Sequence, residues 1–157
     1  MPNWCENNLL IKADGKDALD DFKRLERLLN ETLKYDSEGE SIENLLDSII
    51  SFPEVLRGTT EKEPYKLEDG TTIWWYEWCI NTWGTKWEAS NCIAYIRENR
   101  MRFSFLTANT PPINWLEKVG SLFPNLWIKL DYNEPGMCFR GTASGRGEII
   151  DEYEEYE

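Results

Sequence analysis

Residues 92–107, CIAYIRENRMRFSFLT, decide the fold of this chain of 157 residues. Two runs that are rich in β-branched and aromatic residues, 92–97 and 101–107, flank the short polar segment 98–100. Runs of this kind on both sides of a tight polar turn predict an antiparallel β-hairpin.

The segment after this hairpin predicts a helix and two further strands. Thr110-Pro111-Pro112 is typical of a helix start, where proline's missing N–H costs nothing. Apolar residues then recur at helical spacing, at Ile113, Leu116, Val119 and Phe123. We expect strands over 126–132 and 137–141, a turn at 134–136, and a loop over 142–147, which contains two glycines.

The segment before the hairpin predicts a strand at 6–12 and a helix that begins at Lys16, with Asp14 as its cap. The helix is indicated by apolar residues at three- and four-residue steps, Leu19, Phe22, Leu25, Leu28, Leu29 and Leu33. The resulting order, strand, helix, two strands, helix, strand, predicts an α+β fold. Its helices should pack on one face of an antiparallel sheet, and a β extension should follow at the C-terminal end.

An insertion at about 36–72 separates the first helix from the hairpin. Residues 36–40 are predicted to form a turn, and Ser41 to cap a second helix. The apolar face of that helix would be Ile42, Leu45, Leu46, Ile49 and Ile50. Residues 58–70 have loop composition. We therefore expect a mainly helical insertion.

Residues 73–87, IWWYEWCINTWGTKW, contain five of the eight tryptophans. As a helix, this segment would place Trp74 and Trp78 on one face, and Gly84 would suit the left-handed position that ends it. As a strand, it would divide the aromatic residues between two faces. The spacing favours a short helix.

The net charge of −12 is unevenly distributed. The sums are −1 for residues 1–30, −7 for 31–69, +2 for 70–147 and −6 for 148–157. We predict one domain over 1–147 and an acidic tail over 148–157, either a solvated end or an arm that competes for a basic groove. The first five residues of this run could still belong to a last strand. The overall acidity argues against direct nucleic-acid binding, although the segment 70–147 could hold a local anion site.

The sequence contains few residue patterns that are typical of catalytic or metal sites. The chain contains no histidine, so histidine-dependent triads and HExxH sites are excluded. Cys5, Cys79, Cys92 and Cys138 lack the spacing of a metal site. We expect no metal, no cofactor and no enzyme activity; the catalytic alternative is Cys79 as a nucleophile, with Lys86 lowering its pKa.

Targeting and membrane signals are also missing from the sequence. No basic and apolar leader and no run of eighteen apolar residues occurs. The expected location is therefore the cytoplasm.

The tryptophan segment is also the main candidate for a ligand site. Tryptophans combined with a few polar groups could stack a flat ligand such as a nucleobase. The candidate pocket residues are Trp4, Trp75, Glu77, Trp78, Asn81, Trp83, Lys86 and Trp87. The alternative is that these tryptophans belong to the hydrophobic core.

Several motifs carry a family resemblance. They are MPNWCENNL (1–9), FPEVLRG (52–58), WYEW (75–78), NTWGTKW (81–87), the Pro-Pro pair with a helix ending in Phe-Pro (111–124), and EPGMCFRG (134–141). Together they resemble the YubB-like ferredoxin-like domain family, also called Api-like phage proteins. The resemblance implies a ferredoxin-like fold and an origin on a phage, prophage or plasmid, and it supplies no catalytic residues. The chain departs from the family at Asn109, where members often have tryptophan.

These observations predict a non-enzymatic accessory protein of a mobile element, located in the host bacterial cytoplasm. It would bind and inhibit a host protein, a CRISPR-type or other nuclease effector of defence, through acidic surfaces. The candidate partner-binding residues are Asp36, Glu38, Glu40, Glu43, Asp47, Asp151, Glu152, Glu154, Glu155 and Glu157. The alternative function is a module that sequesters a nucleotide-like small molecule in the tryptophan-lined pocket.

Overall fold

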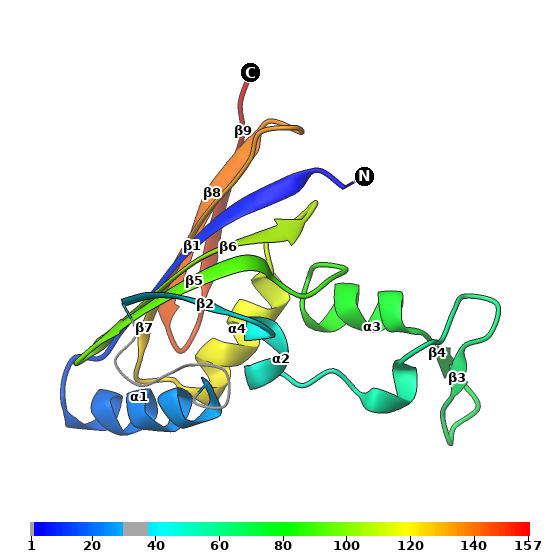
Figure 1. Cartoon of the computed structure of the whole chain (residues 1–157), viewed down its shortest axis with the longest axis horizontal. Coiled ribbons are helices and arrows are strands. Elements are labelled where there is room, and N and C mark those ends of the chain that lie inside the picture. Colours follow the sequence, from blue (N-terminus) through cyan, green and yellow to red (C-terminus); the bar gives the residue numbers. More distant parts are fainter. Residues whose placement is uncertain (1, 30–37) are drawn as a thin grey trace.

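The computed structural model describes residues 2–29 and 38–157. Its main feature is a seven-stranded antiparallel sheet with the order β2-β5-β6-β1-β7-β8-β9 (Figure 1). The strands are β1 (Trp4–Lys12), β2 (Glu38–Ile42), β5 (Ser90–Arg97), β6 (Arg100–Ala108), β7 (Trp127–Glu134), β8 (Phe139–Arg146) and β9 (Ile150–Glu155).

The remaining elements are helical or short. They are α1 (Lys16–Leu29), α2 (Leu45–Ile49), the 3₁₀ turn η1 (Glu54–Leu56), α3 (Trp75–Thr82), α4 (Ile113–Leu122), and the small hairpin of β3 (Tyr65–Lys66) and β4 (Thr72–Ile73). Within the described residues, no helix is long and apolar enough to span a membrane.

The predicted βαββαβ core is confirmed. It consists of β1, α1, β5, β6, α4 and β7, and its four strands lie side by side in the order β5-β6-β1-β7. Figure 1 shows α1 and α4 on the same side of the sheet. The predicted hairpin is β5 and β6, joined by a two-residue turn.

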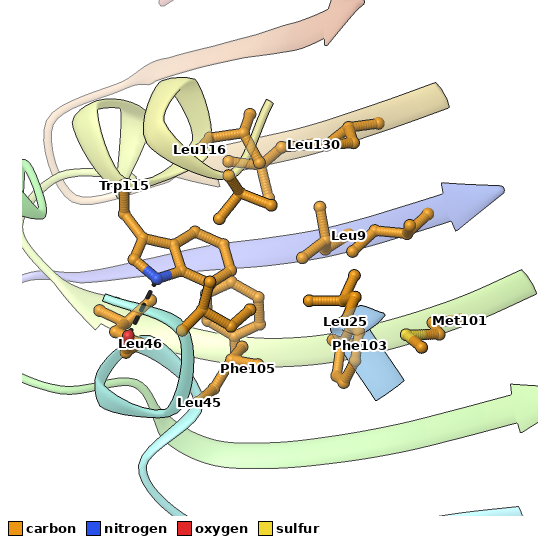
Figure 2. Packing of buried hydrophobic residues seen from close by; sticks show 14 of the residues in the cluster. Leu9, Leu25, Leu45, Leu46, Met101, Phe103, Phe105, Trp115, Leu116 and Leu130 are labelled. Atoms are coloured by element: carbon orange, nitrogen blue, oxygen red, sulfur yellow. Dashed lines mark hydrogen bonds between the residues drawn. The ribbon is translucent and has the colours of Figure 1, made fainter. Parts of the chain in front are cut away.

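The core lies between the sheet and these helices. Along β1, Cys5, Asn7, Leu9 and Ile11 are buried while the residues between them are more exposed, as expected for a strand with one covered face. Trp115 of α4 is fully buried, and its Nε1 donates to the Leu46 carbonyl at 3.0 Å (Figure 2). That hydrogen bond gives the buried indole N–H an acceptor in place of water, and it links α4 to α2.

The buried face of α1 differs from the predicted one. Ala18, Phe22, Leu25 and Leu29 are buried, but Leu19 and Leu28 are 39% and 44% exposed. Each of these two leucines lies one position, or about 100° of helix rotation, away from the buried stripe. Leu33 lies outside the described residues.

The insertion contains a strand that the sequence patterns did not predict. Residues 38–40, expected in a turn, and Ser41, expected as a helix cap, belong to β2, which pairs with the edge of β5. The second helix therefore begins later, at Leu45, after Asn44 in the left-handed conformation. The open edge of the hairpin offered backbone hydrogen bonds that outweighed local helix propensity. Part of the predicted loop 58–70 likewise pairs as β3 with β4.

The C-terminal part also contains more strand than predicted. The expected loop 142–147 is largely the end of β8, where Ala143 is buried against the core. The acidic segment 148–157 contains β9, which pairs with β8 over its whole length while all six of its residues are exposed. The β extension is thus a hairpin added to the free edge of β7.

Candidate functional site

The tryptophan segment forms the predicted helix α3 and ends as expected. Gly84 has a φ of 86°, and its N–H donates to the carbonyls of Cys79 and Ile80 at 3.0 and 3.1 Å. This left-handed closure turns the chain toward α4, where a Cβ on Gly84 would lie only 3.1 Å from the Asn114 backbone nitrogen. Glycine is therefore required at this position.

Three of the candidate pocket tryptophans pack within the protein. Trp78 contacts Phe52 and Trp83 edge to face, with ring centroids 5.4 and 5.2 Å apart. Trp83 is 4% exposed, and its Nε1 donates to the Ile50 carbonyl at 2.9 Å. Trp75, at the start of α3, also packs against the core cluster. These side chains fasten α3 to the insertion.

The other candidates of this group lie at the surface. Trp87 is 40% exposed, its ring lies 6.3 Å from that of Trp4, and the Lys86 ammonium stands over it at 4.3 Å. Glu77 and Asn81 are exposed on α3. The eight candidates therefore divide between internal packing, a surface aromatic pair and an exposed helix face.

Two of the family-like motifs, 1–9 and 81–87, are linked at one end of the sheet by a partly buried hydrogen-bond network. Asn7 donates to Thr107 Oγ1 at 2.9 Å, and Thr107 donates to the Thr110 carbonyl at 2.7 Å. Thr110 and Thr85 donate in turn to the carbonyls of Gly84 and Ala108. Sequence patterns missed this network, although a polar residue at the buried position 7 of an alternating strand was its visible signal.

Cys5, Cys79 and Cys92 have the properties of core residues, whereas Cys138 is half-buried. Cys79 is 3% exposed, and burial, followed by the negative charge of Glu88, raises its pKa to about 12. Burial likewise raises the pKa values of Cys5 and Cys92 to about 12. A protonated, inaccessible thiol is the opposite of an activated nucleophile. In the part of the chain that the structure describes, no cluster of three or more Cys, Asp or Glu could hold a metal ion.

The candidate acidic residues of the insertion lie near one edge of the sheet. Glu38 and Glu40 belong to the edge strand β2, Glu43 is exposed, and Asp36 lies outside the described residues. Asp47 has a structural contact, because its Oδ1 accepts the Phe52 backbone N–H at 2.7 Å.

The remaining candidate acids lie on the opposite edge, in and after β9. Asp151 accepts the Tyr132 hydroxyl at 2.6 Å, and Glu154 pairs with Arg140. Glu152, Glu155 and Glu157 are exposed. Six strand spacings separate β2 from β9, about 29 Å at 4.8 Å each. The acidic candidates thus form two separate edges and not one patch.

The open face of the sheet, opposite the helices, carries a group that the sequence patterns missed. Its basic and aromatic residues gather where the β5–β6 hairpin turns, beside a hollow of about 490 Å³. The lining side chains on this face include Leu10, Tyr95, Arg102, Ser104 and Lys129. Period-two alternation of Tyr95, Arg97, Arg100 and Arg102 in the predicted hairpin was the signal for it.

The C-terminal half of the chain is similar in sequence to a known domain family. Residues 82–157 match the family model of the ferredoxin-like domain in Api92-like protein. The matched part runs from the end of α3 through β9 and includes the β8–β9 extension. No curated protein sequence matches the chain.

A solved structure extends this likeness to the whole fold. The crystal structure of protein api92 from Yersinia pseudotuberculosis is 12% identical, with a TM-score of 0.56, and the match covers 100% of this chain and 99% of that one. Identity this low shows a shared fold and nothing about activity. The expected ferredoxin-like fold and likeness to Api-like proteins are confirmed, while the YubB-like name and the mobile-element origin stay predictions.

Proposed function

We propose that this chain is a non-catalytic binding protein whose acidic edge strand β9 binds a basic host protein. A nucleic-acid-binding defence effector of a bacterial host, such as a nuclease, has the complementary charge, and binding would inhibit it. The YubB-like resemblance, with its implied origin on a phage, prophage or plasmid, fits this role.

The exposed edge strand β9 is the observation that carries the proposal. Four of its six residues are carboxylates, all six are exposed, and β9 is the last strand of the sheet. An edge strand of this kind offers backbone hydrogen bonds for strand addition, and its carboxylates steer a basic partner toward it. Tyr153, 53% exposed, adds apolar contact area beside the charges.

A protective role is the competing explanation for the same strand, because charged side chains on an edge discourage aggregation. The two explanations differ in what neutralisation does. If the charges protect the edge, their loss would promote self-association. If they recognise a partner, their loss would weaken partner binding and would not cause self-association.

The test neutralises the three glutamates that have no basic partner among the described residues, as Glu152→Gln/Glu155→Gln/Glu157→Gln. Binding to host proteins is compared by quantitative affinity purification at two salt concentrations. The matched control, Glu61→Gln/Glu63→Gln/Glu68→Gln, removes equal charge from the exposed β3–β4 region.

We expect the β9 variant to lose a salt-sensitive partner that the control variant retains, while remaining monomeric. Equal recovery of every partner by both variants would contradict the proposal. Self-association of the β9 variant with unchanged partner binding would instead assign these charges to protection of the edge.

A further inference from the structure

We infer that the open face of the sheet binds single-stranded nucleic acid at the end where the β5–β6 hairpin turns. This surface, called the basic end below, comprises Lys12, Tyr95, Arg97, Arg100, Arg102, Trp127, Lys129 and Arg146. Its arginines on β5 and β6 lie at least four strand spacings from the acidic outer strand β9, so the inference does not depend on the function proposed above.

Strand register places these residues on one face in two adjacent rows. Residues directly opposite one another in an antiparallel sheet project to the same side. The first row runs across five strands as Arg97, Arg100, Lys12, Trp127 and Arg146, and the second begins Tyr95, Arg102, Leu10 and Lys129. Five strands span about 19 Å at 4.8 Å per spacing.

The basic end concentrates positive charge in two adjacent rows. It holds six of the 17 lysines and arginines, and Arg100 faces a like charge on each neighbouring strand. Like charges opposite one another destabilise a sheet. Among residues 2–29 and 38–157, Arg100 and Arg102 form no ion pair. This row of like charges lowers the stability of the sheet, and a bound anion would relieve the repulsion.

Acidic groups near the basic end compensate it only weakly. Asp131 lies 3.8 Å from the Lys129 ammonium and Asp14 lies 3.9 Å from the Arg146 guanidinium, and all four side chains are about half exposed. Exposed ion pairs of this length contribute little. On the side of the insertion, β2 places Glu38 opposite Tyr95 in register.

Two aromatic residues stand among these cations. Tyr95 is 47% exposed, and Trp127 is half-buried on a strand three spacings away, about 14 Å. Tyr95 and Arg102 line both the hollow of about 490 Å³ and a second one of about 500 Å³. Asn8, Ser104 and Asp131 add hydrogen-bonding groups to the first hollow.

This combination favours a single strand over other polyanions. Cations along a surface track the phosphates, and exposed rings stack on unpaired bases, whose faces a duplex hides. An acidic polypeptide would use the charges and leave the rings unused. The acidic strand β9 does not prevent binding, because Arg102 lies four strand spacings, about 19 Å, from it. The screening length is about 8 Å at physiological salt.

Fluorescence anisotropy with a labelled oligothymidylate of about twelve nucleotides tests the inference. We expect Arg100→Gln/Arg102→Gln to weaken binding roughly tenfold or more. The slope of log affinity against log salt should fall by about 1.4, or about 0.7 for each phosphate that an arginine no longer neutralises. The charge-matched control Lys62→Gln/Lys66→Gln, in the exposed region around β3, should bind within about twofold of the parent.

The aromatic contribution is tested at Tyr95. Tyr95→Leu keeps bulk but removes the ring, and it should weaken binding about fivefold or more, whereas Tyr95→Phe should stay within about twofold. Matched thermal unfolding curves establish that each variant is folded. Duplex DNA, a mononucleotide and polyglutamate should each bind more weakly than the oligothymidylate.

Several results would overturn the inference. These are no binding of the parent protein to the oligothymidylate at low salt, equal weakening by the arginine and lysine double variants, or polyglutamate binding as tightly as the oligonucleotide. The Glu152→Gln/Glu155→Gln/Glu157→Gln variant should bind the oligonucleotide at least as well as the parent. A failure here is therefore distinguishable from a failure of the β9 proposal.

Discussion

Asp21 and Arg24 connect α1 to the residues that directly follow α4. Asp21 is 6% exposed and lies on the buried side of α1. Its carboxylate accepts the Arg24 guanidinium at 2.7 Å and the Asn125 N–H at 3.0 Å. Arg24 in turn lies over the Phe123 ring, 5.0 Å from its centroid. An acid on a buried helix face is unexpected from hydrophobic spacing, and only the tertiary partners explain it.

Asp21→Asn should lower the free energy of unfolding by about 1–2 kcal/mol at neutral pH, because two charge-assisted hydrogen bonds weaken. Burial alone would raise the pKa of Asp21, but the bonds from Arg24 and Asn125 outweigh it and hold the pKa below its ordinary value. The contribution is therefore complete above the unfolded-state pKa of about 4 and disappears as the pH falls through the lower native pKa.

Urea unfolding of the Asp21→Asn variant at neutral and acidic pH measures this difference. The exposed neighbour Asp20→Asn is the control and should change stability little. A deficit for Asp21→Asn that is as large at the lowest pH as at neutral pH would contradict the assignment.

The β8–β9 hairpin depends on a close approach between strands. Gly141 lies opposite Tyr132, whose hydroxyl passes over it to reach Asp151 on β9. A Cβ at this glycine would meet the Tyr132 phenol and would lie 2.6 Å from the Glu152 carbonyl oxygen. The glycine therefore makes room for the hydrogen bond that fastens β9.

Gly141→Ala should destabilise the protein by about 1–3 kcal/mol, because the added methyl group overpacks the hairpin. Tyr132→Phe removes the hydroxyl and should partly rescue that loss, so the two changes should be non-additive. Thermal unfolding of the two single variants and the double variant forms the cycle. Strictly additive losses would show that the hydroxyl is not the obstacle.

The sequence predicted the helices and strands that have strong local patterns, and it missed the strands that form only by pairing with a neighbouring strand. The β5–β6 hairpin, α3 and α4 follow from alternation, helical spacing and the positions of glycine and proline. In contrast, β2 and β9 contain few apolar residues. They form strands because they pair with the free edges of β5 and β8. The basic end was missed for the same reason, since its rows exist only once the register is known.

The molecule as a whole is a neutral sheet body with acidic outer strands, and this changes what removing its C-terminus would do. Deletion of residues 148–157 would remove β9, the acceptor of the Tyr132 hydroxyl and the 2.6 Å bond from Tyr156 to Asn133. It would also expose the edge of β8. The deletion is thus a structural change as well as a change of charge.

We expect the deleted protein to unfold at lower urea concentration and to self-associate through β8. The variant Glu152→Gln/Glu155→Gln/Glu157→Gln keeps the strand and should remain monomeric with nearly unchanged stability. Light scattering after size exclusion and urea unfolding measure both properties. A deleted protein that is monomeric and fully stable would show that β9 contributes nothing to the sheet.

The central position of β1 has a kinetic consequence. Its neighbours are β6 and β7, so Asn7 reaches its partner Thr107 across 100 residues, and the hydrogen-bonded centre of the sheet joins distant parts of the chain. Contacts so remote in sequence must close large loops before they stabilise anything, which slows folding. The hairpin of β5 and β6 closes only a short loop, so we expect it to form before β1 enters between β6 and β7.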